Sequence, residues 1–107
     1  MQYVYTTRFK RDSKKLSKSN PHFRQDLIDF LDDLDPMHGE IIPETHGARK
    51  IRMAMLGKGK SGSYRVIYFV CAKSILFLTI YGKNVKDNLT SDDKREIRKL
   101  ISTFTPC

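Results

Sequence analysis

The 107-residue sequence predicts one α+β domain, in which a small antiparallel β-sheet packs against N-terminal helices and a C-terminal helix. Helix-period apolar patterns occur near both ends of the chain, and two continuous runs of β-branched and aromatic residues lie between them. A chain of this length buries one hydrophobic core. Residues 1–107 are therefore expected to form a single domain in the order strand, helix, helix, three strands, helix.

The N-terminal part is expected to hold a short strand and two helices. Residues 3–6 favour a strand, and residues 8–16 form a basic segment with two apolar anchors that predicts a short helix. A second helix is predicted over residues 21–34, because Asn20 can cap it and Pro21 is tolerated at a first helical position. Its apolar residues recur with a 3.6-residue period and form a stripe that faces the core.

The central segment alternates loops and strands. Residues 37–47 contain a proline and two glycines and predict a loop, whereas residues 50–55 begin with alternating basic and apolar residues and predict a strand. Three glycines and two lysines make residues 56–63 an exposed loop. The apolar runs 64–72 and 75–81 predict a hairpin at the centre of the sheet with both faces covered.

The last helix is expected to begin after Thr90, whose hydroxyl can cap it, with Asp92 and Asp93 in the first turn. The residues predicted to form its apolar face are Ile97, Leu100, Ile101 and Phe104.

The positive charge is concentrated in one stretch. The sequence has 20 Lys and Arg against 12 Asp and Glu, which gives a net charge of +8 and a pI near 9.7. Between Glu44 and Asp87 there is no acidic residue, but there are nine basic ones: Arg49, Lys50, Arg52, Lys58, Lys60, Arg65, Lys73, Lys83 and Lys86. Positive and negative residues mixed along the chain would be enough for solubility. The concentration of positive charge in one stretch therefore indicates a polyanionic partner such as nucleic acid.

Other chemistries have weak support in the sequence. The three histidines lie apart, and Cys71 and Cys107 have no near neighbour to form a metal or redox pair, so a reduced cytoplasmic setting fits best. The stretch 57–62 contains Gly-Lys-Ser but precedes a strand, which argues against a nucleotide-binding loop. We expect no metal, no cofactor, no signal peptide and no membrane span.

The remaining candidates are cations carried by the predicted strands. Lys50 and Arg52 share one face of the strand over residues 50–55. Arg65 interrupts the next, apolar strand, where a charge is costly unless it is paired or used. Tyr81 and Lys83 end the last strand, and antiparallel order can bring all five side chains to one end of the sheet.

Three blocks, residues 47–52, 57–68 and 78–84, resemble in their order the HigB branch of the RelE/ParE toxin superfamily. The resemblance runs from about Gly39 to Ile101. It implies a type II toxin that cleaves messenger RNA, usually in the ribosomal A site, and that is silenced by a cognate antitoxin encoded beside it. The implied partners are therefore mRNA on the ribosome and an antitoxin protein.

The cation set fits cleavage of RNA without a metal, because RNA carries its own nucleophile, the 2′-OH. In this hypothesis Arg65 grips the scissile phosphate, while Arg52 and Lys83 share the developing charge. Lys50 or Tyr81 transfers the proton. The residues expected to bind the RNA backbone are Arg49, Lys58 and Lys60. Two alternatives stay open: a ParE-like inhibitor of DNA gyrase, and a non-catalytic RNA-binding module.

Overall fold

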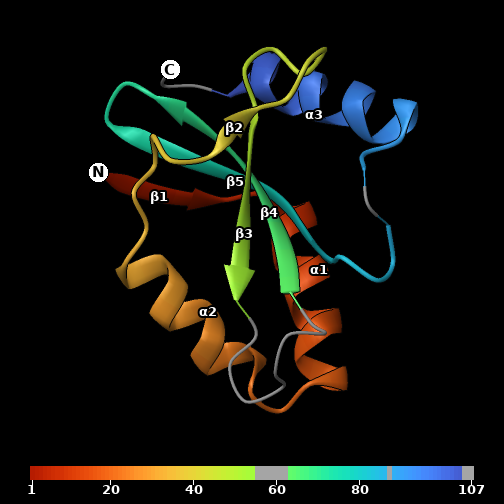
Figure 1. The fold of residues 1–107 in the computed structure, drawn as a ribbon. Helices are drawn as coiled ribbons and strands as arrows, with labels where there is room; N and C mark the ends of the chain where they lie inside the picture. Colours follow the sequence, from red (N-terminus) through yellow and green to blue (C-terminus); the bar gives the residue numbers. More distant parts are fainter. Residues whose placement is uncertain (55–62, 87, 105–107) are drawn as a thin grey trace.

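A computed structural model describes residues 1–54, 63–86 and 88–104. A five-stranded sheet with the order β1-β5-β4-β3-β2 carries α1 and α2 on one face and α3 on the other (Figure 1). The elements are β1 Gln2–Tyr5, α1 Thr7–Ser19, α2 Phe23–Asp32, β2 Glu40–Ile41, β3 Arg49–Ala54, β4 Ser63–Cys71, β5 Ser74–Gly82 and α3 Ser91–Thr103. The predicted α+β class is confirmed.

Two apolar clusters hold the helices against opposite faces of the sheet. On one face Phe9 of α1 and Phe23 of α2 belong to the same buried cluster as Phe77 of β5. On the other face Ile97 of α3 packs with Leu78 of β5. Every residue of β5 is buried, because this strand has neighbours on both sides and helices over both faces. The prediction of a central hairpin with both faces covered is therefore correct.

The sheet is mixed rather than purely antiparallel, which differs from the prediction. β1 pairs with β5 in parallel, whereas the pairs β5–β4, β4–β3 and β3–β2 are antiparallel. A parallel partner requires a long connection. Here α1, α2 and the other strands separate β1 from β5 along the chain. The residue pattern of a short strand does not show which strand it pairs with, or in which direction.

The strand β2 lies inside the segment 37–47 that the sequence predicts to be a loop. Glu40 pairs with Lys50, and Ile41 pairs with Arg49. Two residues are too few to show the alternation by which a strand is recognised. The strand exists because the adjacent edge of β3 supplies its hydrogen-bond partners.

The helix boundaries follow their caps. α1 begins after Thr6, whose hydroxyl accepts from the backbone of Phe9, and it extends three residues beyond the predicted end. Asn20 ends α1, and its amide donates to the buried Tyr64 hydroxyl at 2.9 Å. Its side-chain oxygen accepts from the His22 N–H at 3.0 Å, in the turn before α2. α2 therefore begins at Phe23 rather than Pro21. Among the described residues, no helix has the length and apolarity needed to cross a membrane.

α3 begins where the sequence predicts, with a reciprocal capping box. The Thr90 hydroxyl accepts from the Asp93 backbone at 3.1 Å, and the Asp93 carboxylate accepts from the Thr90 backbone at 3.0 Å. Arg8 of α1 and Lys86 each donate to the same carboxylate at 2.8 Å. Burial by itself would raise the pKa of Asp93, but these donors outweigh it and hold the pKa well below the ordinary value.

Candidate active site

Arg52, Arg65 and Tyr81 form one row across three strands. Arg52 pairs with Arg65 between β3 and β4, and Arg65 pairs with Tyr81 between β4 and β5. Side chains of directly paired residues project from the same face, with Cβ atoms about 5 Å apart. Tyr81 belongs to the cluster under α3. The register therefore brings two guanidinium groups and a phenol together on the α3 side of the sheet.

The other two predicted catalytic residues adjoin this row. Lys50 lies two positions before Arg52 on β3, so its side chain projects from the same face. Lys83 is exposed in the turn that follows β5. Its backbone N–H donates to the carbonyl of Ser63 at 3.0 Å, which places Lys83 beside the start of β4.

The cations of the row are not neutralised within the described parts of the chain. Arg65 donates to the Ser63 hydroxyl at 3.1 Å, but neither Arg65, Arg52 nor Lys50 forms an ion pair with a described carboxylate. Like charges placed directly opposite on neighbouring strands destabilise a sheet. An anion bound over Arg52 and Arg65 would remove this repulsion.

A pocket of about 210 Å³, here called the α3 pocket, shares residues with this set. Its lining residues come from β2 and the segment after it, from β3 and β5, and from α3 and the segment before it: Glu40, Ile41, Ile42, Pro43, Lys50, Tyr81, Asn88, Leu89 and Lys94. Two predicted catalytic residues, Lys50 and Tyr81, thus meet in one cavity. Lys94 and Asn88 were not predicted as site residues, because a lysine in the first turn of a surface helix, or an asparagine before that helix, looks like any solvated residue.

Lys86 is another residue near the site that was not predicted from the sequence to belong to it. Its ammonium group lies 4.9 Å from the centre of the Tyr81 ring, within the range of a cation–π contact. The same ammonium donates to Asp93, which holds Lys86 in place. Only 7% of Tyr81 is exposed. The phenol is therefore fixed between the core and a tethered cation.

Comparison with known families identifies the class of protein. The family model described as the RelE toxin of the RelE / RelB toxin-antitoxin system matches residues 44–106. The chain belongs to the RelE toxin family. It is therefore a toxin of a toxin-antitoxin system, and the family implies a cognate antitoxin as its partner. The matched range contains all eight residues predicted from the sequence to act in catalysis or RNA binding.

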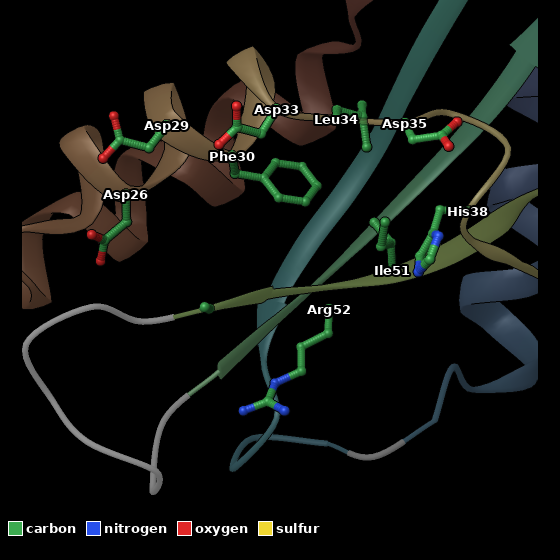
Figure 2. Close-up of a pocket in the computed structure, with 10 residues that line it drawn as sticks. Asp26, Asp29, Phe30, Asp33, Leu34, Asp35, His38, Ile51 and Arg52 are labelled. Carbon is green, nitrogen blue, oxygen red and sulfur yellow. The ribbon is translucent and has the colours of Figure 1, made fainter.

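A larger groove of this RelE toxin, about 440 Å³ between α2 and β3, has the opposite charge character (Figure 2). It is lined by Asp26, Asp29, Phe30, Asp33, Leu34, Asp35, His38, Ile51, Arg52 and Ala54. Figure 2 shows Arg52 pointing away from the aspartates of α2. Four carboxylates in this groove repel a phosphate, whereas the Arg52 side chain points away from them toward the α3 side of the sheet.

Of the residues predicted to bind RNA, the structure describes only Arg49, which lies outside the row. Arg49 projects from the face opposite Lys50, and its guanidinium donates to the Gly39 carbonyl at 2.8 Å. Its contact with RNA stays a prediction. Lys58 and Lys60 lie outside the described residues. Within the described ranges, no group of three or more His, Cys, Asp or Glu side chains could hold a metal ion.

Proposed function

We propose that this RelE toxin is a HigB-like endoribonuclease that cleaves mRNA in the ribosomal A site without a metal ion. The observation that carries the proposal is the row of Arg52, Arg65 and Tyr81, with Lys50 on the same face. Guanidinium groups match phosphate oxygens through paired hydrogen bonds. The toxin acts in the cytoplasm and is silenced when its antitoxin covers this cationic face.

The proposed reaction uses the 2′-OH of the RNA as the nucleophile. Arg65, at the centre of the row, holds the non-bridging phosphate oxygens, and Arg52 and Lys83 share the charge that builds on them. Cations fixed on a rigid sheet need little reorganisation as the charge develops. Lys50 or Tyr81 protonates the leaving 5′-oxygen. The products are a 2′,3′-cyclic phosphate and a 5′-OH.

Binding of RNA is assigned to cations outside the row. Arg49, Lys58 and Lys60 contact the RNA backbone of mRNA or of the ribosome. Such contacts release counterions, so the affinity of the toxin for ribosomes falls as the salt concentration rises.

One experiment separates this function from the alternatives. The purified protein is incubated with translating ribosomes, the RNA ends are mapped, and gyrase supercoiling is assayed in parallel. The nuclease leaves ends with a 5′-OH, whereas a ParE-like toxin blocks supercoiling and leaves RNA intact. A binding module does neither. Arg65→Ala is the test variant, and Lys73→Ala, which alters an exposed lysine in the turn between β4 and β5, is the matched control.

A further inference from the structure

Glu40 lines the α3 pocket, but none of the proposed reaction steps described so far involves it. Of the described residues that line this pocket, Glu40 alone carries a carboxylate. It pairs directly with Lys50 across β2 and β3, so both side chains project from the same face. The pocket thus combines an acceptor of protons with two donors, the Lys50 ammonium and the Tyr81 hydroxyl.

The backbone that carries Glu40 is fixed from three directions. The N–H of the preceding residue, Gly39, donates to the Tyr68 hydroxyl at 3.1 Å, and the Gly39 carbonyl accepts from the Arg49 guanidinium at 2.8 Å. A Cβ at position 39 would collide with the Tyr68 hydroxyl, so the close approach requires glycine. After β2, the N–H of Ile42 donates to the carbonyl of Ala48 at 2.8 Å. These contacts preorganise the position of Glu40.

The Glu40 side chain has no bonding partner in the described part of the chain. Within the described residues it forms neither an ion pair nor a hydrogen bond, whereas the other two glutamates of the chain are engaged. Glu44 lies 3.6 Å from Lys94, and Glu96 lies 3.0 Å from Arg8. The Glu40 carboxylate is therefore available to a bound ligand.

We infer that Glu40 is a catalytic residue, the general base that removes the proton from the 2′-OH of the scissile nucleotide. The inference rests on the proposed nuclease function. The carboxylate takes the 2′-OH proton, the 2′-oxygen forms a bond to phosphorus, and the bond from phosphorus to the 5′-oxygen breaks. The 5′-oxygen then takes a proton from Lys50 or Tyr81. Glu40 has gained one proton and the acid has lost one, and exchange with water restores both.

Glu40→Gln tests this role, because the amide keeps the shape of the side chain but cannot accept the proton. The single-turnover cleavage rate at saturating protein should fall by about 100-fold or more, the usual contribution of a general base. Ribosome affinity should not weaken, since the substitution removes a negative charge near phosphate. The matched control is Glu96→Gln, which lies on α3 outside the pocket and should cleave like the wild type.

The pH profile distinguishes a base from a structural residue. The wild-type rate should rise from acidic to neutral pH, and Glu40→Gln should lose this acidic limb. The charged and titratable groups that face Glu40 in the pocket are Lys50 from β3, Tyr81 from β5 and Lys94 from α3. Each is unchanged in Glu40→Gln, so loss of the limb reports on Glu40.

Glu40→Ala provides a second test, which does not depend on whether Glu40→Gln folds. Added formate should restore part of the cleavage lost in Glu40→Ala, because a small carboxylate can occupy the vacated space. The inference is overturned if wild-type protein cleaves RNA while Glu40→Gln cleaves within about twofold of it. It is also overturned if formate restores nothing to a folded Glu40→Ala. Wild-type protein that leaves RNA intact would instead refute the proposed function, and this inference with it.

Discussion

Replacing Asp93 with Asn tests the ion cluster that joins α3 to the rest of the fold. The Asp93 side chain is 13% exposed, and it accepts from the side chains of Arg8 and Lys86 and from the backbone of Thr90. Asn can keep the bond from Thr90 but has no charge for the two cations. A hydrogen bond to a charged group contributes about 1.5–3 kcal/mol when buried. Lys86 is 28% exposed and Arg8 keeps Glu96, so the net loss should be about 2–4 kcal/mol.

This loss should be visible in thermal unfolding followed by circular dichroism. For a domain of this size each kcal/mol lowers Tm by roughly 5 °C, so Asp93→Asn should melt about 10–20 °C below the wild type at pH 7. The control is Asp92→Asn, whose carboxylate is 87% exposed and pairs with Arg95 at 3.3 Å. Its Tm should change by about 2 °C or less.

The difference should depend on pH in a defined direction. The folded state depresses the pKa of Asp93, so its stabilisation is complete above the unfolded pKa of about 3.9 and is lost as pH falls through the folded pKa. The gap in Tm between wild type and Asp93→Asn should therefore narrow below about pH 4. A variant that melts with the wild type at pH 7, or a gap that stays constant on acidification, would refute the assignment of the cluster.

The remaining predictions concern the RNA chemistry. Arg65→Ala should lower the single-turnover cleavage rate by roughly 100-fold while folding and ribosome affinity barely change, and normal cleavage in a quench-flow assay would remove Arg65 from the mechanism. Lys58→Ala combined with Lys60→Ala should weaken RNA binding and reduce its salt slope by roughly 0.7 per lost contact, with the rate at saturation near wild type. A double variant that binds fully but does not cut would assign the catalytic role to these two lysines. Cleavage should survive EDTA under conditions that leave ribosomes intact, and its abolition would contradict a metal-free reaction.

The elements with strong local signals were predictable from the sequence. The apolar runs of β4 and β5, the capping signal at Thr90 and the helical stripe of α2 all appear in the structure near their expected positions. Asn20 shows why the predicted start of α2 is wrong. Its side-chain oxygen accepts from the His22 N–H at 3.0 Å, as the oxygen of a cap would, while its amide donates to the buried Tyr64 hydroxyl, yet α2 begins only at Phe23. The local side-chain bond thus marks the turn that precedes α2 and not the first residue of the helix.

The sequence predicts those parts of the candidate site that depend only on the alternation of side chains along a strand. Lys50 and Arg52 share a face because they lie two residues apart on a strand. Arg65 can be recognised because it is a charged residue in an apolar strand. Glu40 and Lys94 could not be found this way. Glu40 enters the pocket only because β2 pairs with β3, and Lys94 only because α3 folds back over the sheet. Both depend on tertiary placement that no local pattern encodes.

The groove beside α2 and the row beside α3 differ in charge, and this difference bears on where an anion can bind. Aspartates of α2 line the groove on one side, while the row of Arg52, Arg65 and Tyr81 lies on the other. At physiological ionic strength a charge is screened over about 8 Å, so an approaching phosphate responds mainly to the face it nears. It is repelled at the α2 groove and attracted at the α3 side. Under the proposed function, the row and the α3 pocket are therefore better suited than the α2 groove to receive RNA.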